Sequence, residues 1–108
     1  MTFVNLQGRE RRERFPGYWG HFVHSSNMTF VHWKIVAGSP LPEHSHTHEQ
    51  VANVLEGQFE LTINGETKVV GPGEVAIIPA NALHSGCAIT DCKIIDVFYP
   101  IREDYIGL

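Results

Sequence analysis

The sequence predicts an all-β protein made of one domain. Turn signals recur every eight to twelve residues, and the stretches between them alternate apolar and polar side chains in the manner of half-buried strands. Residues 20–100 contain no sustained helical period. Many short strands joined by regular turns are typical of a β-sandwich or a β-barrel.

Six strands are expected between residues 29 and 99. In chain order they cover residues 29–36, 44–55, 59–63, 66–70, 74–78 and 93–99. The first is rich in β-forming residues, and the third alternates Phe, Leu and Ile with Glu and Thr. Asn64-Gly65 joins the third strand to the fourth, and this dipeptide is the strongest short hairpin signal because both residues accept a positive φ.

A chain of 108 residues is large enough for one hydrophobic core and too short for a second module. We therefore expect residues 1–108 to form one domain. Residues 1–20 are expected to be an edge strand or an arm, and the barrel is expected over about residues 28–100.

Composition excludes several classes of function. The formal net charge of −4 argues against nucleic acid as a partner, because backbone phosphates bind basic faces. No apolar run approaches the ~20 residues that span a bilayer, so no membrane partner is expected. The N-terminus has no signal-peptide pattern, and a cytoplasmic location is expected. Cys87 and Cys92 are too few for a disulfide framework and are expected to be reduced.

The run from Pro42 to Gln50 carries the strongest functional signal. If it is a strand, His44 and His46 point to one face, with Cα atoms roughly 6.6 Å apart. Two imidazoles can share one ion across that distance, at about 2.1 Å each. Gln50 has the same parity and offers a carbonyl oxygen, and His84 is a fourth candidate. The run therefore predicts a metal site.

Two spaced motifs resemble those of the cupin superfamily. The first consists of glycine, five residues, His-x-His, three or four residues, glutamate, six residues and glycine. Gly38, His44, His46, Gln50 and Gly57 match every spacing, with glutamine in the glutamate position.

The second motif consists of glycine, five residues, proline, one residue, glycine, two residues, histidine and, four positions later, asparagine. It appears as Gly73, Pro79, Asn81, His84 and Ala88, of which Asn81 and Ala88 depart from the pattern. The joint match is specific, whereas either motif alone is weak. The resemblance implies a single-domain cupin β-barrel, a jelly-roll-like double-stranded β-helix, and a homodimer. It also implies one divalent metal bound by His44, His46, Gln50 and His84.

A narrower resemblance, to the pectin-degradation cupins, rests on three features. They are His-x-His-x-His-x-Gln at residues 44–50, Pro-Ala-Asn at residues 79–81, and the run over residues 96–104. Those proteins are linked to opening 4,5-unsaturated monouronates, the sugars left by pectate or alginate lyases, into linear 5-keto-4-deoxyuronates. The resemblance implies a non-redox, metal-dependent isomerase or lyase-type enzyme acting on a small acidic sugar. It places Asp96, Phe98 and Arg102 beside the metal.

The charge of the expected donor set favours Lewis-acid chemistry. Three neutral imidazoles and one neutral amide leave the +2 charge of an ion uncancelled, so it polarises a bound oxygen more strongly. Such a site suits an oxidised iron in an O₂ cycle less well. The metal itself stays open, because imidazole-rich sites accept Ni, Zn, Cu, Fe or Mn.

Four residues are candidates for contact with a substrate. Asp96 lies on the same strand face as Ile94 and Phe98, and a carboxylate there is costly to bury unless it is paired or used. Asp96 is therefore the candidate general base or acid, with a structural hydrogen-bond acceptor as the alternative. Arg102 is the second catalytic candidate and would bind the substrate carboxylate, unless it pairs with a neighbouring acid on the surface. Phe98 would stack on the sugar or belong to the core, and His48 is expected to line the pocket.

Two rival functions stay open. A metal-dependent dioxygenase of a small organic substrate would consume O₂. A non-enzymatic cupin that binds a sugar or effector would convert nothing. A different lyase or isomerase of an acidic metabolite is a third alternative.

Overall fold

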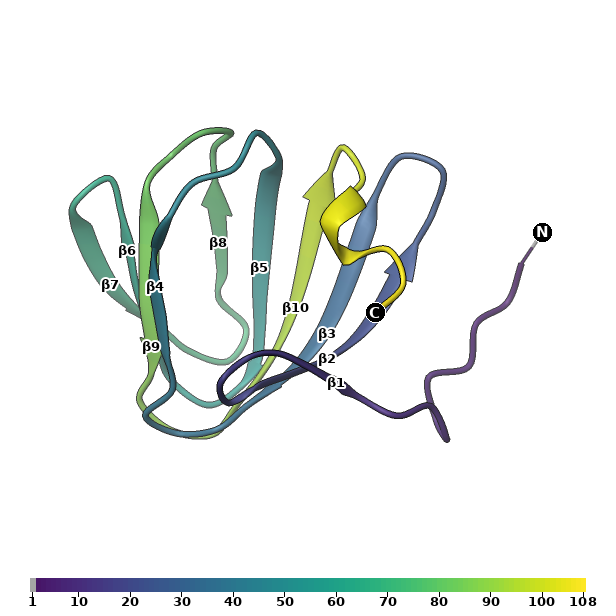
Figure 1. The fold of residues 1–108 in the computed structure, drawn as a ribbon. Helices are drawn as coiled ribbons and strands as arrows, with labels where there is room; N and C mark the ends of the chain where they lie inside the picture. Colours follow the sequence, from purple (N-terminus) through teal and green to yellow (C-terminus); the bar gives the residue numbers. More distant parts are fainter. Residues whose placement is uncertain (1) are drawn as a thin grey trace.

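Two antiparallel β-sheets face each other in the computed structural model, which describes residues 2–108 (Figure 1). The larger sheet has the strand order β1-β2-β3-β10-β5-β8, and the smaller has the order β4-β9-β6-β7. In chain order the elements are β1 (Arg12–Phe15), β2 (Tyr18–His24), β3 (Thr29–Ile35), β4 (Pro40–His44), β5 (Glu49–Glu56), β6 (Phe59–Ile63), β7 (Glu66–Val70), β8 (Val75–Ile78), β9 (His84–Ala88), β10 (Cys92–Tyr99) and the 3-10 helix η1 (Glu103–Tyr105). The all-β prediction is confirmed.

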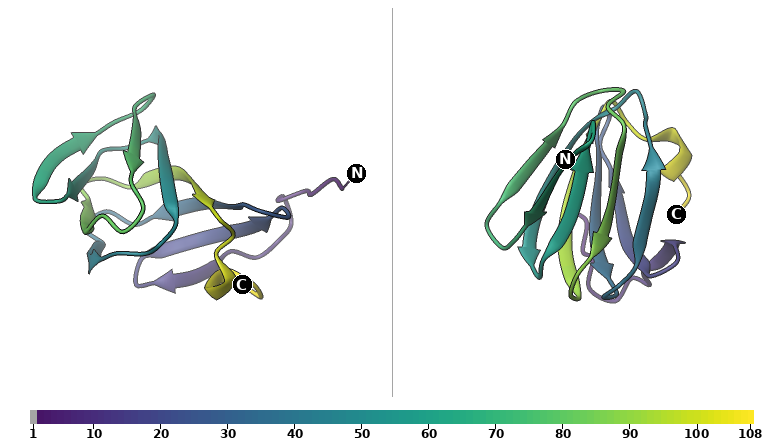
Figure 2. Two further views of the ribbon diagram at one scale, coloured as in Figure 1. Left: turned by 90° about the horizontal axis from the view of Figure 1, so that it is seen from above. Right: turned by 90° about the vertical axis from the view of Figure 1, so that its left-hand side faces the viewer.

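The core fills the space between the two sheets. Two further views show the sheets from above and from the side of the smaller sheet (Figure 2). Trp33 of β3 lies at the centre of the core, with its ring centroid 6.0 Å from that of Tyr18 and 5.4 Å from that of Phe22. Both contacts are edge-on, the arrangement that aromatic quadrupoles favour. On β10 the side chains of Ile94, Asp96 and Phe98 point into the core, which confirms the predicted alternation.

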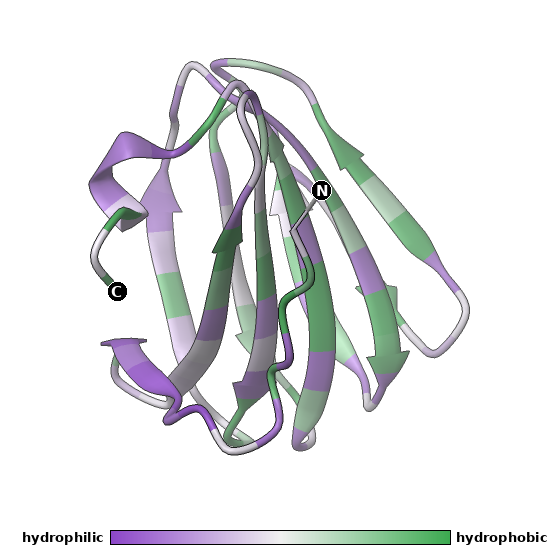
Figure 3. Ribbon diagram, turned by 90° about the vertical axis from the view of Figure 1, so that its right-hand side faces the viewer, coloured by the Kyte–Doolittle hydropathy of each residue, from purple (hydrophilic) through white to green (hydrophobic). Residues whose placement is uncertain are grey.

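The predicted hairpin at Asn64-Gly65 is confirmed. It joins β6 to β7, and both turn residues have a positive φ, 47° at Asn64 and 83° at Gly65. This mirror-image turn has the twist that antiparallel strands need. Hydrophobic bands recur along the strands, as the colouring by hydropathy shows (Figure 3).

The expected strand over residues 44–55 is wrong. β4 ends at His44 and β5 begins at Glu49, and residues 45–48 connect the smaller sheet to the larger one. The polar run cannot continue as one strand, because its two ends belong to different sheets. A hydrogen bond from the Asn81 N–H to the His46 carbonyl, 2.8 Å, holds this crossover in place.

The sequence patterns missed three strands, β2, β4 and β9. β4 contains Pro40 and Pro42, which are tolerated because β4 is an edge strand. β9 contains the weak strand former Gly86, where a Cβ atom would lie 2.4 Å from the ring of Phe59. β1 and β2 lie in or next to the segment that was expected to be an edge strand or arm. β1 is the edge strand of the larger sheet, whereas β2 extends beyond residue 20 and pairs fully with β3.

The two chain ends leave the sheets in different ways. Residues 2–8 extend away from the body of the molecule and residues 9–11 lead along the larger sheet into β1, whereas residues 100–108 fold back beside β3 (Figure 1). Met1 of the expected N-terminal segment lies outside the described residues. None of the helical structure in residues 2–108 is long and apolar enough to cross a membrane.

Asn81 has the left-handed backbone conformation, with φ 65°, where the motif has glycine. Asparagine tolerates this region better than other residues with a Cβ atom. We expect Asn81→Ala to lower the free energy of unfolding by about 1 kcal/mol, because alanine is strained at this φ. Urea denaturation measures the change. Asn81→Gly is the matched control and should be close to the wild type; equal stability of the alanine and glycine variants would contradict the argument.

Candidate metal centre

Three histidines come together at one end of the two sheets, although they belong to different elements. His44 ends β4, His46 lies in the crossover, and His84 begins β9. His44 and His84 are paired across the two strands, and their ring centroids lie 4.1 Å apart. The candidate ligand atoms of the three rings all lie within 4.8 Å of one another. The three rings meet because β4 pairs with β9 and because the crossover brings His46 back toward them. They do not meet because His44 and His46 share one face of a single strand, as the sequence suggested.

The Nδ1 atom of each of the three rings lies against a backbone carbonyl. The partners are the carbonyls of Pro42 for His44 at 2.8 Å, of His48 for His46 at 3.0 Å and of Ala82 for His84 at 2.9 Å. A carbonyl can only accept, so each Nδ1 carries the proton and each Nε2 has a free lone pair. This is the arrangement that orients histidines for a metal, with the second ring nitrogen held by the protein.

The donor set fits a divalent cation. Nε2 of His84 is buried and has no hydrogen-bond partner among the described residues. Nε2 of His46 and Oε1 of Gln50 lie 3.1 Å apart, and with the proton on Nδ1 both are acceptors. Acceptors that face each other in a buried site are stabilised by a cation between them. The structure therefore brings Gln50, which the sequence placed as the fourth ligand, to the same point as the three histidines.

His46 and His84 are kept neutral, which is the form that binds metals. Burial, with smaller contributions from the charges of Arg102 and His84, lowers the pKa of His46 to about 4. Burial also lowers the pKa of His84, with smaller contributions from His44 and Arg102. Neither ring must lose a proton near neutral pH before it can bind an ion.

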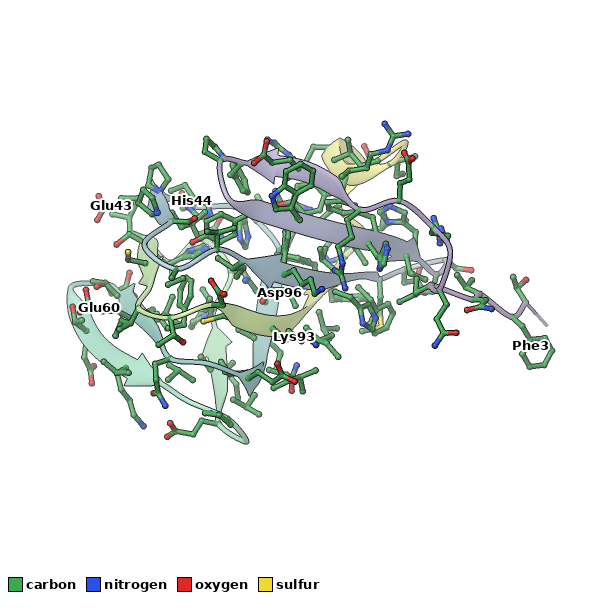
Figure 4. All side chains as sticks on the ribbon, turned by 90° about the horizontal axis from the view of Figure 1, so that it is seen from below. Phe3, Glu43, His44, Glu60, Lys93 and Asp96 are labelled. Atoms are coloured by element: carbon green, nitrogen blue, oxygen red, sulfur yellow. The ribbon has the colours of Figure 1, made fainter. Side chains whose placement is uncertain are left out.

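Asp96 lies between the sheets, close to this cluster (Figure 4). Its Oδ2 accepts a hydrogen bond from Trp33 Nε1 at 2.9 Å, while its Oδ1 is buried without a hydrogen bond to the described residues. Burial raises the pKa of Asp96 to about 6, against the opposing effects of Gln50, Trp33 and the charge of Arg102. A buried carboxylate that titrates near neutral pH can take up and release a proton.

Arg102 pairs with Asp104, as the alternative of a pair with a neighbouring acid expects, but at 7% exposed it is buried rather than on the surface. Its Nε and Nη2 donate to the two carboxylate oxygens of Asp104 at 3.0 and 2.7 Å. The guanidinium carbon lies 4.8 Å from the ring centroid of Phe98 and 4.1 Å from that of Tyr105. Asp104 therefore occupies one edge of the guanidinium, and Nη1 makes no hydrogen bond to residues 2–108.

Sequence reasoning missed the residues that hold Arg102. Thr29 Oγ1, fully buried, accepts a hydrogen bond from the Arg102 backbone N–H at 2.8 Å. His24 Nδ1 lies 2.8 Å from the same oxygen, and His24 Nε2 lies 3.3 Å from the Tyr105 carbonyl. The Tyr105 carbonyl can only accept, so His24 Nε2 donates to it, and in a neutral ring Nδ1 then accepts from the Thr29 hydroxyl. No sequence motif marks these residues, because they are brought together by the return of the C-terminal segment.

The remaining candidates line the space beside the cluster. Phe98 is buried, and its ring centroid is 5.7 Å from that of His46 and 6.5 Å from that of His48. Nδ1 of His48 is buried and has no hydrogen-bond partner within residues 2–108. A mostly apolar cavity of about 50 Å³ lies below, with Gln50, His84 and Asp96 among its lining. This volume holds a few water molecules but no sugar ring.

Comparison with known proteins gives matches over most of the chain. The family model described as the cupin domain matches residues 31–98. The pectin degradation protein KdgF of Dickeya dadantii (strain 3937) is 33% identical over 82 residues, which cover 73% of this chain and 72% of that protein. The matched family region contains the four candidate ligands, Asp96 and Phe98, whereas Arg102 lies beyond it.

Two solved structures are similar over nearly the whole chain. KdgF from Halomonas sp. superposes with a TM-score of 0.92 at 27% identity, over 98% of this chain and 99% of that chain. An RmlC-like cupin from Shewanella frigidimarina superposes with a TM-score of 0.91 at 26% identity, over 98% of this chain and 96% of that chain.

We expect His84→Ala to abolish stoichiometric binding of a divalent transition metal, because it removes one of three convergent lone pairs. Metal content after dialysis and calorimetric titration with Ni²⁺ or Zn²⁺ measure the loss. His32→Ala is the control, since His32 pairs with Ile95 on the outer face of the larger sheet and should bind metal like the wild type. Full metal content in the His84 variant would contradict the assignment.

Proposed function

The chain belongs to the cupin family, and from this premise we propose that it is a metal-dependent enzyme of pectin or alginate breakdown. The proposed reaction converts a 4,5-unsaturated monouronate to the linear 5-keto-4-deoxyuronate without redox chemistry. The name of the 33% identical relative, a pectin degradation protein, supports the substrate class. The observation that carries the reaction type is a buried carboxylate, Asp96, beside three histidines with convergent lone pairs.

One divalent ion, Ni, Zn, Fe or Mn, held by His44, His46, Gln50 and His84 would supply a Lewis acid that polarises an oxygen of the substrate. The donor set supports this role because all four groups are neutral, so no protein charge cancels that of the ion. The choice among the metals stays a prediction.

Asp96 is the proposed proton-transfer residue. With a pKa of about 6, it is largely ionised at neutral pH and can accept the proton of the sugar's anomeric hydroxyl as the bond between the anomeric carbon and the ring oxygen breaks. The protonated carboxyl can then return the proton to C4, so that the released enol becomes the 5-keto group, the anomeric carbon becomes an aldehyde, and no atom is gained or lost. Its unpartnered Oδ1 is the atom available for this transfer, because Trp33 occupies Oδ2.

Arg102 is the proposed binding group for the substrate carboxylate. Asp104 accepts hydrogen bonds from Nε and Nη2, which leaves Nη1 available. The substrate carboxylate would therefore bind at the Nη1 edge of the guanidinium. Phe98, packed under Arg102, and His48 would line the sugar's path. Because the inner cavity is too small for the ring, the sugar would bind at the mouth and present only its reacting end to Asp96.

The cellular setting follows from the same proposal. The lyases that release unsaturated uronates supply the substrate, and the expected cytoplasmic location stays a prediction. The rival functions, a dioxygenase and a non-enzymatic sugar-binding cupin, differ from this proposal in whether O₂ is needed and whether anything is converted.

We expect the metal-loaded protein to remove the ultraviolet absorbance of a lyase-generated unsaturated monouronate faster than the spontaneous background. The rate should be the same with and without O₂, and Asp96→Ala should lower it by about 10²-fold or more while metal content is unchanged. A rate that needs O₂ would indicate the dioxygenase. No acceleration would rule out the uronate reaction, and normal turnover by the variant would remove Asp96 from it.

The acid limb of the pH–rate profile should reflect Asp96, with activity falling as the pH drops below about 6. Trp33→Phe removes the hydrogen bond that lowers this pKa, so the limb should move to higher pH. Trp19→Phe is the control, because the half-exposed Trp19 lies on the other face of the sheet. A limb in Trp33→Phe that stays in place or moves to lower pH would contradict the role of Asp96.

A further inference from the structure

The first strand contains an arginine that the proposed reaction does not use. β1 pairs with β2, and its register shifts between Glu13 and Phe15, so Arg14 is the extra residue of a β-bulge. A bulge bends its strand, and bulges next to functional sites often turn a side chain toward them. Arg14 is half-buried, whereas Arg12 and Glu13 before it are exposed. The bulge therefore brings one charged side chain of this strand in from the surface.

Two aromatic rings contact the guanidinium of Arg14. Its central carbon lies 4.6 Å from the ring centroid of Phe15 and 5.5 Å from that of Tyr105. Both rings also line the inner cavity, together with Asp96. β1 and η1, the elements that contain these rings, lie side by side when seen from above and from below (Figure 2 and Figure 4). Arg14 therefore lies at the edge of the cavity, against the aromatic side chains that form its wall.

Arg14 and Arg102 lie against the same tyrosine. The guanidinium carbon of Arg102 is 4.1 Å from the ring centroid of Tyr105, so the guanidinium carbons of the two arginines are at most about 10 Å apart. Burial raises the pKa of Tyr105 to about 12, and the charges of both arginines act against this rise. The return of the C-terminal segment beside β1 thus places two cations at one end of the cavity.

Asp104 gives the second cation a role in the binding of an anion. Its carboxylate accepts two hydrogen bonds from Arg102, so the two side chains together have no net charge. The hydrogen bond from Arg102 is the main cause that lowers the pKa of Asp104, and the charge of Arg14 adds to the effect, so Asp104 is ionised at neutral pH. A second carboxylate near Arg102 would be repelled by Asp104. The positive charge of Arg14 offsets this repulsion.

The N–H groups of Arg14 are available to a ligand. Among residues 2–108, the arginine side chains that donate hydrogen bonds are those of Arg11 and Arg102. The ion pairs of the same residues use Lys68, Lys93 and Arg102. A guanidinium has five N–H donors in a planar fork that matches a carboxylate. Arg14 uses none of them within the described chain, although it is half-buried.

We propose that Arg14 is a second substrate-binding residue, which acts with Arg102 to bind the carboxylate of a sugar acid at the mouth of the site. The inference rests on the proposed function for the identity of that sugar. Arg14 supplies the positive charge that Asp104 cancels on Arg102. It contributes to binding and takes no part in proton transfer, because a guanidinium stays protonated.

NMR titration of the zinc-loaded protein with D-galacturonate and with its uncharged methyl ester tests the contact. D-Galacturonate is the saturated sugar acid of pectin, so its binding does not depend on ring opening. We expect Arg14→Ala to raise the dissociation constant for the acid about tenfold and that for the ester less than about twofold, because only the acid has a charge to bind. Arg14→Lys keeps the charge without the planar fork and should lie between Arg14→Ala and the wild type.

Arg12→Ala is the matched control, because it removes the same charge from an exposed position of the same strand. Its dissociation constant for the acid should stay within about twofold of the wild type. In the turnover assay, Arg14→Ala should raise KM by the same factor as the dissociation constant and leave kcat within about twofold of the wild type.

Three results would overturn the role of Arg14. They are unchanged binding of the acid by Arg14→Ala, an equal loss of acid and ester binding, which indicates packing, and an equal loss in Arg12→Ala, which indicates net charge alone. The reaction is judged separately. Binding of the acid that depends on Arg14, without turnover of the unsaturated sugar, would refute the proposed reaction and keep Arg14 in a sugar-acid site. Turnover with the same KM in Arg14→Ala would keep the reaction and overturn the role of Arg14.

Discussion

The site depends on one constraint: polar atoms buried between two apolar sheets must be hydrogen-bonded or used. Each histidine of the cluster meets half of this constraint through Nδ1 and a backbone carbonyl, which fixes the ring and its tautomer. Trp33 does the same for one oxygen of Asp96. The atoms left without partners, Nε2 of His84 and Oδ1 of Asp96, are those that face the proposed chemistry. The hydrogen bond made by one polar atom of each side chain thus fixes the direction in which its other polar atom points.

The charged side chains around the histidine cluster include both signs, so no large net charge builds up there. Arg102 lowers the pKa of His46 and disfavours a second cation nearby, but Asp104 pairs with it and Asp96 lies within its field. A divalent ion on neutral ligands would therefore enter a region that already contains two carboxylates and one guanidinium. Aromatic rings hold this arrangement, since Phe98 and Tyr105 lie on the guanidinium and contact each other at 5.8 Å between centroids. The C-terminal segment is part of the site because Thr29 and His24 fix its backbone.

The sequence by itself determined the fold class, the Asn64-Gly65 hairpin, the inward face of β10 and the three histidines of the cluster. These features are local, since they depend on alternation, turn residues and motif spacing along the chain. Only the tertiary structure decided how the histidines meet, because His44 and His46 belong to an edge strand and a crossover rather than to one strand. It also decided the burial of Arg102 and the roles of Thr29, His24 and Tyr105, which lie far apart in the sequence. Contacts between distant segments form only when two sheets pack, and no pattern within either segment records them.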